Sequence, residues 1–142
     1  LRKMKEESGK EMLFIAPTGI AAINVGGETI HSAFGFQPGI LDCNTKGKIG
    51  ERQRQILTNV ETIVIDEASM VRCDIVDAID RTLRYFCVSN LPFGGKQMIF
   101  TGDLFQLEPI VASSEKEFFM DEYNTQKPYF YKECVFQHSL DP

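Results

Sequence analysis

Long hydrophobic segments are missing from this chain of 142 residues. No apolar run approaches the roughly 20 residues that a membrane-spanning helix needs. The order of basic, apolar and small residues that marks a secretion signal is missing at the start of the sequence as well. With 43% hydrophobic and 25% charged residues, the composition is that of an ordinary globular protein of one domain. We expect no membrane partner.

Closely spaced cysteines are also missing. Cys43, Cys73, Cys87 and Cys134 form no CxxC pair, and only two histidines accompany them. This spacing argues against a zinc cluster and against a disulfide-stabilised scaffold. We expect reduced thiols and an intracellular location, in the cytoplasm, the nucleoid or the nucleus.

The chain has no excess of positive charge. Its net charge is −5, which does not indicate a protein that binds nucleic acid over its whole surface. The charge is uneven, however, because one short stretch holds Lys46, Lys48, Arg52 and Arg54 against only Glu51. A local surface of this kind suits a phosphate backbone.

The first ten residues, "LRKMKEESGK", have the pattern of the second half of a helix that Gly9 closes. Arg2 and Lys3 suit its C-terminal end because the negative end of the helix dipole lies there. No helix start precedes them, and the chain does not begin with methionine. We therefore expect the sequence to be a piece of a longer protein.

Short apolar runs alternate with helical patterns along the chain. Buried strands are predicted at 11–16, 62–66 and 96–103, where apolar residues lie between turn-forming residues. Helices are predicted at 18–25 and 29–34, capped by Thr18 and Thr29, and at 52–59, 71–86 and 115–123; the rest is predicted as irregular at 35–50, a turn at 91–95, and a strand or helix at 128–136. This alternation predicts an α/β fold with a parallel sheet.

Each of the three strands switches from apolar to polar or small residues at its C-terminal end. "LFIA" leads to "PTG", "TIVI" to "DEAS", and "MIFT" to "GD". Parallel strands share one edge at these ends, and open α/β sheets bind ligands there. The sequence therefore places Thr18, Asp66, Glu67 and Asp103 near one another.

Two adjacent carboxylates, Asp66 and Glu67, follow the second strand. Carboxylates at the rim of an apolar sheet are costly unless they are solvated or paired. A Mg²⁺ ion would relieve Asp66, and Glu67 would then polarise a water for attack on a phosphate, as in the Walker-B arrangement. In the alternative, Asp66 caps the following helix and Glu67 is solvated. Because the other two strands end in the same way, we favour the metal site.

The segments after the first and third strands also suit phosphate chemistry. Thr18 and Gly19 begin a helix, whose free N–H groups can bind the phosphate of a nucleotide or of DNA, although an ordinary capped helix has the same sequence. Gly102 permits close backbone approach. Asp103 can cap the loop or bind a metal-bound water, and Gln106 can sense a terminal phosphate or satisfy the loop backbone.

His31 and two nearby aromatic residues, Phe34 and Phe36, each have a functional and a structural interpretation. A lone histidine is more often structural than a ligand. Phe34 and Phe36 could stack on the bases of a single strand, but core packing is the alternative for at least one of them.

Three long segments, "APTGIAAINVGGETIHSAFGF", "IVIDEASMV" and "FGGKQMIFTGDLFQLEPI", resemble in order and spacing the PIF-type DNA helicases, relatives of RecD in superfamily 1. The resemblance is clear from about residue 1 to residue 111 and weaker beyond. It implies a RecA-like P-loop NTPase fold, of which residues 1–142 would be part of the first domain, with a small inserted element at about 35–55. It also implies ATP-driven 5′-to-3′ movement on single-stranded DNA and unwinding at duplex junctions, with ATP and Mg²⁺ as cofactors.

The resemblance also assigns roles residue by residue. Asp66 would hold Mg²⁺, Glu67 would be the catalytic base, and Gln106 would read the γ-phosphate of ATP beside Gly102 and Asp103. Contact with DNA, or its support, would come from Pro17, Thr18, Gly19, Thr29 and His31, and from Lys46 and Lys48 of the inserted element near the strand-separating wedge.

The departures from the family concern the phosphate site. No GxxxxGK[ST] loop occurs in the chain, although this loop cradles the phosphates and supplies a lysine. We expect the chain to begin just after that loop and to lack the second RecA-like domain. The family topology places the strand with "QMIFTG" beside the P-loop strand, so its edge would be open and the segment less stable alone. Glu108 replaces the first of two usual prolines and adds negative charge beside the phosphate edge.

Two other functions remain open. The chain could be a non-catalytic remnant that binds DNA or protein through the same scaffold. It could also be another Mg²⁺-dependent phosphoryl hydrolase that uses Asp66, Glu67 and Asp103.

Overall fold

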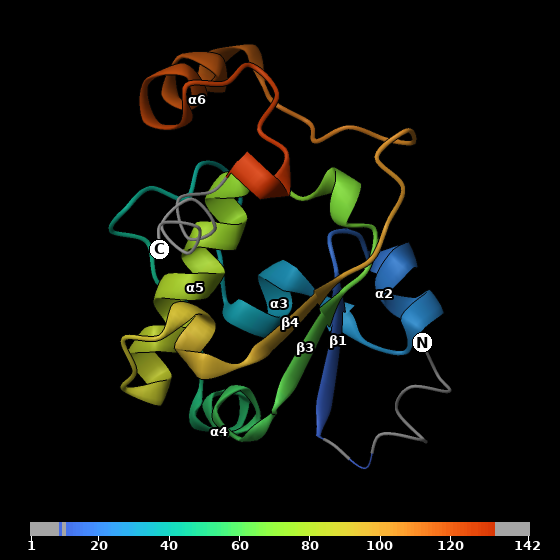
Figure 1. Cartoon of the computed structure of the whole chain (residues 1–142), viewed down its shortest axis with the longest axis vertical. Coiled ribbons are helices and arrows are strands. Elements are labelled where there is room, and N and C mark those ends of the chain that lie inside the picture. The colour runs from blue at the N-terminus through green and yellow to red at the C-terminus, as the bar shows by residue number, and fades with distance from the viewer. Residues whose placement is uncertain (1–8, 10, 133–142) are drawn as a thin grey trace, which may run out of the picture.

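The computed structural model describes residue 9 and residues 11–132. Within this part, four parallel strands form one sheet in the order β2-β1-β3-β4, with helices packed around it (Figure 1). The strands are β1 (Met12–Ala16), β2 (Glu28–Thr29), β3 (Thr62–Ile65) and β4 (Gln97–Phe100). The predicted α/β class and parallel sheet are confirmed.

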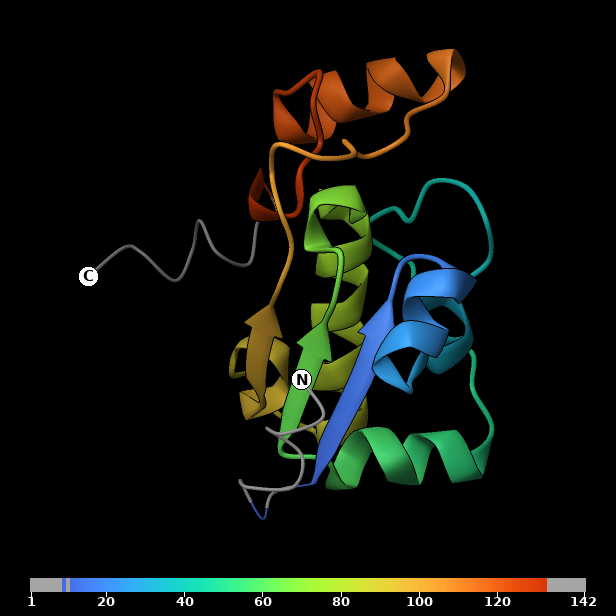
Figure 2. The ribbon, with the colours of Figure 1, turned by 90° about the vertical axis from the view of Figure 1, so that its right-hand side faces the viewer.

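The strands are aligned so that their C-terminal ends form a common edge. Ile15 of β1 pairs with Ile65 of β3, which in turn pairs with Phe100 of β4. Figure 2 shows the arrowheads of these three strands pointing the same way. The predicted third strand is shorter than expected, because residues 101–103 lie beyond the end of β4.

The helices follow the predicted segments closely. The α-helices are α2 (Gly19–Val25), α3 (Ile30–Phe34), α4 (Glu51–Asn59), α5 (Cys73–Cys87) and α6 (Lys116–Tyr123). Single 3₁₀ turns lie at η1 (Ala68–Met70), η2 (Pro92–Gly95), η3 (Ser113–Glu115) and η4 (Phe130–Lys132). Residues 35–50 contain no helix or strand, as predicted. No helix among the described residues is long and apolar enough to cross a membrane.

The main core lies between one face of the sheet and α5. Ile63 and Ile65, two residues apart on β3, point to the same face and are fully buried against Val76, Ile79 and Leu83 of α5. The helical spacing of the apolar residues on α5 places them on one stripe. Each such side chain contributes about 1.5–3 kcal/mol when it is fully buried, so α5 fixes the position of the sheet edge.

At the other end of the sheet order, β4 is an edge strand within the described residues. The four residues of β3 are all buried, whereas Gln97 of β4 is exposed and the other three are only partly buried. An open edge at β4 agrees with the expectation from the sequence. That a P-loop strand fills this edge stays a prediction.

Two expectations change. The two-residue strand β2 was missed, because so short a segment shows no alternation of apolar and polar residues. Phe34 and Phe36 are 0% and 5% exposed and stack on each other with ring centroids 5.5 Å apart. The interpretation that they stack on bases is therefore wrong, and both belong to the core.

Some expectations fall on residues outside the described part of the chain. These are the helix before Gly9, Cys134 and the end of the segment 128–136; only the single turn η4 is seen in the latter. Among the described residues, Cys43 and Cys87 are free thiols, and Cys73 is buried at the start of α5.

Candidate functional site

The sheet hydrogen bonds continue past the ends of the strands and fix the loops that follow. The N–H of Asp66 donates to the carbonyl of Ile15 at 2.9 Å, and the N–H of Thr101 donates to Ile65 at 2.9 Å. The N–H of Ala68 then donates to the carbonyl of Thr101 at 2.8 Å. The loops after β3 and β4 are therefore held together at the sheet edge.

The carboxylate of Asp66 is oriented by the neighbouring strand. The hydroxyl of Thr101 donates a 2.7 Å hydrogen bond to Oδ1 of Asp66. The alternative in which Asp66 caps the next helix is not the arrangement found, because the N-cap of η1 is Glu67 and no side-chain capping bond is made there. Asp66 is half-buried and lies where a polar ligand at the edge can reach it.

Glu67 has an unusual backbone conformation. Its φ and ψ are 52° and 41°, in the left-handed region, which costs energy for a residue other than glycine. The surrounding contacts maintain it, since Ala68 is anchored to Thr101 immediately afterwards. Such local strain is concentrated at functional sites, which agrees with the role predicted for Glu67.

Gly102 is required by packing. A Cβ atom at this position would lie 2.9 Å from the N atom of Ala68 and 3.3 Å from that of Ser69. The loop after β4 therefore lies directly against the loop that carries Glu67. The role predicted for Gly102 at a bound nucleotide stays a prediction.

Asp103 and Gln106 form a small turn after β4. The carboxylate of Asp103 accepts from the N–H of Phe105 at 2.9 Å and from Nε2 of Gln106 at 3.2 Å. The side chains of Asp103 and Gln106 are both exposed. Gln106 therefore contacts a side chain of its own loop, and its amide is presented at the surface near the sheet edge.

Glu108, two residues after Gln106, pairs with Lys127 at 2.9 Å. The hydrogen bond from Lys127 lowers the pKa of the Glu108 carboxyl below its ordinary value. The extra negative charge noted in the sequence is thus opposed by a positive charge from a later segment.

Thr18 and Thr29 both cap short helices. The hydroxyl of Thr18 accepts from the N–H of Ala21 at 3.3 Å, and that of Thr29 accepts from Ser32 at 3.2 Å. The predicted caps are confirmed. Gly19 follows Thr18 as the first residue of α2 and is exposed.

Pro17, Thr18 and His31 line one cavity of about 270 Å³, together with Gly39 and Arg72. Three residues that the sequence pointed to as DNA contacts are thus brought together. Burial lowers the pKa of His31 below its ordinary value of 6.5, and the positive charge of Arg72 acts in the same direction while Asp74 opposes it. These effects favour the neutral imidazole, which can both donate and accept hydrogen bonds.

The basic residues of segment 35–50 lie elsewhere. Lys46 and Lys48 line a separate cavity of about 550 Å³ that also includes Tyr85 of α5. Nζ of Lys46 lies 4.8 Å from the centre of the Tyr85 ring, a distance at which cation–π attraction applies. Both lysines are exposed. This cavity adjoins the one at His31, because Pro38 lines both.

The carboxylate at the sheet edge is of the type that Mg²⁺ takes as a ligand. Among residue 9 and residues 11–132, no group of three or more His, Cys, Asp or Glu residues could hold a metal. Mg²⁺ typically takes one or two carboxylates and completes its shell with water and phosphate oxygens. Asp66 supplies such a carboxylate.

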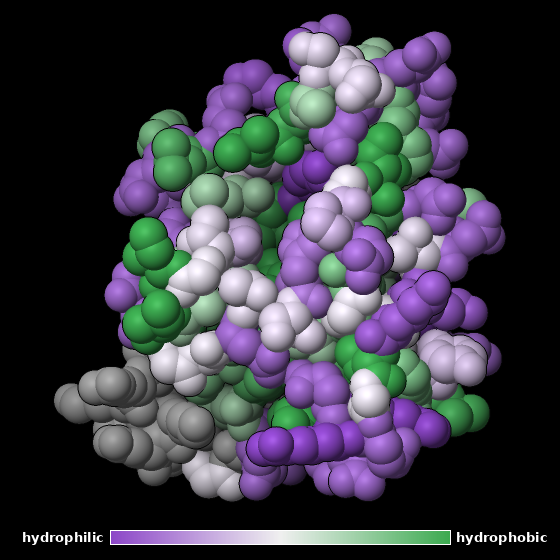
Figure 3. Space-filling model, turned by 180° about the vertical axis from the view of Figure 1, so that it is seen from behind, coloured by the Kyte–Doolittle hydropathy of each residue, from purple (hydrophilic) through white to green (hydrophobic). Residues whose placement is uncertain are grey.

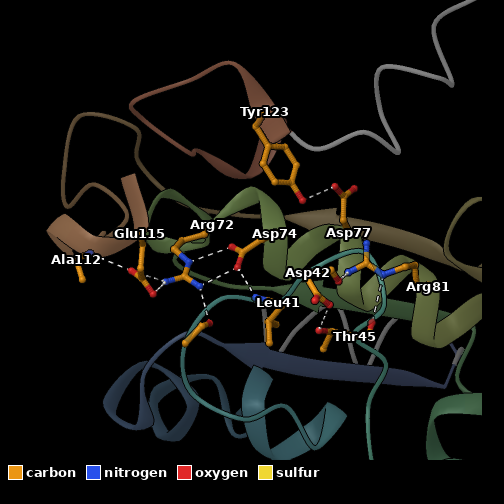
Figure 4. A network of polar contacts seen from close by, with 11 residues as sticks. Leu41, Asp42, Thr45, Arg72, Asp74, Asp77, Arg81, Ala112, Glu115 and Tyr123 are labelled. Atoms are coloured by element: carbon orange, nitrogen blue, oxygen red, sulfur yellow. Dashed lines mark hydrogen bonds and ion pairs between the residues drawn. The ribbon is translucent and has the colours of Figure 1, made fainter. Parts of the chain in front are cut away.

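Arg72, which no sequence pattern marks as functional, joins three segments of the chain (Figure 4). Its guanidinium donates to both oxygens of Asp74, at 3.0 and 2.8 Å, and to the carbonyl of Gly39 at 2.7 Å. It also pairs with Glu115 at 3.4 Å. Apart from Asp74, these partners are far from Arg72 in the sequence, so no local pattern marks them.

A comparison with protein families decides what kind of domain this is. The family described as PIF1-like helicase matches residues 1–138. The chain belongs to the PIF1-like helicase family. The family resemblance seen in the sequence is thereby confirmed, and so is the RecA-like fold, because the structural relatives are Pif1 helicase domains.

Three relatives illustrate the similarity. The ATP-dependent DNA helicase PIF1 of Saccharomyces cerevisiae is 39% identical over 114 residues, which are 78% of this chain and 13% of that protein. A Pif1 structure solved for DNA unwinding at forked duplex DNA by two coordinating helicases is 43% identical, with a TM-score of 0.91 over 96% of this chain. Bacteroides Pif1 in complex with ADP-AlF3 and single-stranded DNA is 44% identical, with a TM-score of 0.89 over 95% of this chain.

The chain spans 33% and 32% of those two solved chains. The PIF1-like helicase domain described here thus corresponds to about a third of the proteins whose structures it resembles.

Proposed function

We propose that this chain is part of an ATP-dependent DNA helicase that moves 5′-to-3′ along single-stranded DNA and unwinds duplex DNA at junctions. The proposal depends above all on the sheet edge, where Thr101 orients Asp66 and the adjacent Glu67 is held in a left-handed conformation. Relatives solved with ADP-AlF3 and single-stranded DNA, and with forked DNA, support it. The direction of movement is inferred from the family.

In this proposal the residues at the sheet edge serve ATP hydrolysis. Asp66 would hold a Mg²⁺ ion, which would supply positive charge against the phosphates. Glu67 takes a proton from the attacking water. Gln106, presented by the turn at Asp103, senses the terminal phosphate, and Gly102 keeps this turn close to the loop of Glu67.

The DNA-binding role is assigned to two surfaces. Pro17, Thr18, Gly19, Thr29 and His31 would contact or support the single strand at the cavity next to α2. A neutral His31 suits this role because it can hydrogen-bond to a base or a phosphate without adding charge. Lys46 and Lys48 would contact a phosphate backbone near the strand junction, where contacts of this kind fix position and carry no sequence information.

We further propose that the 142-residue chain alone does not hydrolyse ATP, because it contains no GxxxxGK[ST] loop to bind the phosphates. Asp66 and Glu67 would then form only the metal-and-water side of the site. ATP turnover by this chain with single-stranded DNA that Glu67→Gln abolishes would refute this part of the proposal.

The test of the main proposal is Glu67→Gln in the full-length protein. The variant keeps the size of the side chain but removes its basicity, so we expect ATPase and unwinding rates to fall at least about 100-fold, with retained binding of ATP. Glu61→Gln is the matched control, since Glu61 is exposed just before the same strand. Equal activity of the Glu67→Gln variant and the wild type would contradict the proposed role of Glu67.

A further inference from the structure

Arg72 lies between the two surfaces to which the proposed function assigns ATP and DNA. It follows Glu67 by five residues, with only η1 and Val71 between them. At the same time it lines the cavity that contains Thr18 and His31. The side chain of Arg72 therefore lines the cavity proposed to bind DNA. Its backbone follows the loop that carries Glu67, which is proposed to act on ATP.

On the DNA side, Arg72 holds the segment that follows α3. Nη2 of Arg72 donates to the carbonyl of Gly39 at 2.7 Å. Arg72 also donates two hydrogen bonds to the carboxylate of Asp74, which in turn accepts from the N–H of Leu41 at 3.0 Å. Both ends of the short stretch 39–41 are therefore attached to the Arg72–Asp74 pair. A ligand in the cavity at His31 would act on this stretch directly.

On the ATP side, Arg72 holds the end of the loop that carries Gln106. Nη1 pairs with Glu115 at 3.4 Å, and Glu115 in turn accepts from the N–H of Ala112 at 2.9 Å. The guanidinium also lies 5.4 Å from the ring of Phe119 on α6. The end of the stretch that follows Gln106, from Ala112 to Glu115, is thus anchored to the same side chain as the stretch 39–41.

The chemistry of these contacts requires an arginine. The Arg72 side chain is 12% exposed and that of Asp74 is 0% exposed, and a buried ion pair adds little net stability compared with apolar residues of similar volume. Its advantage is geometry, because the planar guanidinium directs several N–H donors to fixed positions at once. A lysine ammonium cannot reproduce the two-fold contact with Asp74 together with those to Gly39 and Glu115.

We propose that Arg72 is a positioning residue that couples the occupancy of the DNA cavity to ATP hydrolysis. DNA that displaces the stretch 39–41 changes the contacts of Arg72 and, through them, the placement of the loops that carry Glu67 and Gln106. This inference rests on the proposed function of the sheet edge and the cavity. Arg72 would thus influence ATP hydrolysis without touching ATP or the reacting water.

The test is the ATPase rate of the full-length protein, measured at saturating ATP with and without a single-stranded oligothymidylate. For Arg72→Gln we expect the ratio of the two rates to fall by roughly tenfold, within the range of coupling between binding sites in proteins. Arg72→Lys, which retains the charge, is expected to recover only part of the ratio. Arg84→Gln is the matched control, because Arg84 of α5 also pairs with a carboxylate, that of Asp80, at 2.8 Å, but does not line the cavity at His31.

The outcomes separate the possibilities. A role in stability alone would lower both rates by the same factor, and an unchanged ratio in both Arg72 variants would overturn this inference. If Arg72→Gln does not fold, Arg72→Lys tests the inference instead. A wild-type ratio of the two ATPase rates in Arg72→Lys would contradict the need for the planar guanidinium. A wild-type protein whose ATPase does not respond to DNA would overturn the proposed function as well.

Discussion

Thr101 donates its hydroxyl hydrogen to Oδ1 of Asp66 over 2.7 Å, which joins the ends of β4 and β3 through their side chains. A hydrogen bond to an ionised carboxylate is stronger than one between neutral groups. Because this bond fixes one oxygen of Asp66, the orientation of the carboxylate is set before any ligand binds. Thr101 thus belongs to the candidate site, although the sequence did not single it out.

We predict that Thr101→Val weakens Mg²⁺-dependent ATP hydrolysis in the full-length protein. Loss of a hydrogen bond to a charged group costs about 1.5–3 kcal/mol, so the rate at limiting Mg²⁺ should fall roughly tenfold or more, and Thr101→Ser should restore most of it. A titration of the ATPase with Mg²⁺ measures the effect. Thr62→Val is the control, because Thr62 bonds to Gln97 at the opposite end of the same two strands. The same Mg²⁺ dependence in the Val variants of Thr101 and Thr62 would contradict the prediction.

Gly102→Ala should destabilise the fold. The added methyl group would lie 2.9 Å from the N atom of Ala68, and relief of such a clash costs about 1–3 kcal/mol. Urea denaturation of this chain and its variant would measure the change. For comparison, Gly50→Ala introduces a methyl group into open space and should change stability by less than about 1 kcal/mol. If both variants unfold at the same urea concentration, the close approach at Gly102 has no energetic importance.

The depressed pKa of His31 predicts a pH dependence. Burial and Arg72 lower this pKa below 6.5, against the opposing effect of Asp74. The unfolded state therefore binds more protons than the folded state as the pH falls below 6.5. Stability should be fully present above that pH and decline as the pH falls toward the folded-state pKa.

The measurement is the urea midpoint of the wild type and of His31→Gln across this pH window. The glutamine variant cannot take up the proton, so its midpoint should fall less on acidification. Parallel loss of stability in the two proteins would show that other groups cause the pH dependence.

Much of the fold could be predicted because local patterns determine it. The apolar runs that lead to Pro17, Asp66 and Gly102 end in polar or small residues, and parallel strands bring such ends to one edge. The caps at Thr18 and Thr29 could be predicted for the same reason, since a hydroxyl three residues before a free N–H is a local signal.

The parts that the sequence could not predict depend on contacts between distant segments. Arg72 bonds to Gly39 across 33 positions and to Glu115 across 43, and no periodicity reports such pairs. Phe34 was weighed as a base-stacking residue because its residue type does not reveal that it is fully buried. The roles of Glu67, Gln106 and the DNA contacts stay predictions, because they concern ligands.

Hydrophobic surface remains on this domain. In the space-filling view, hydrophobic groups interrupt the hydrophilic surface on the side where α2 lies (Figure 3). Ile20 and Ile23 of α2 are 77% and 79% exposed, and Phe105 beside Gln106 is 99% exposed. Side chains of this kind commonly mark surfaces that another part of a protein covers.

The open edge of β4 has a geometric consequence for any strand that completes the sheet. If the last residue of a strand added there in parallel pairs with Phe100, the loop after it emerges beside Thr101 and Gly102. That loop would be delivered to the carboxylate of Asp66 by backbone pairing alone. The register of one edge strand can thus set the alignment between the two halves of a nucleotide site, and a shift by a single residue would misplace one half by about 3.3 Å.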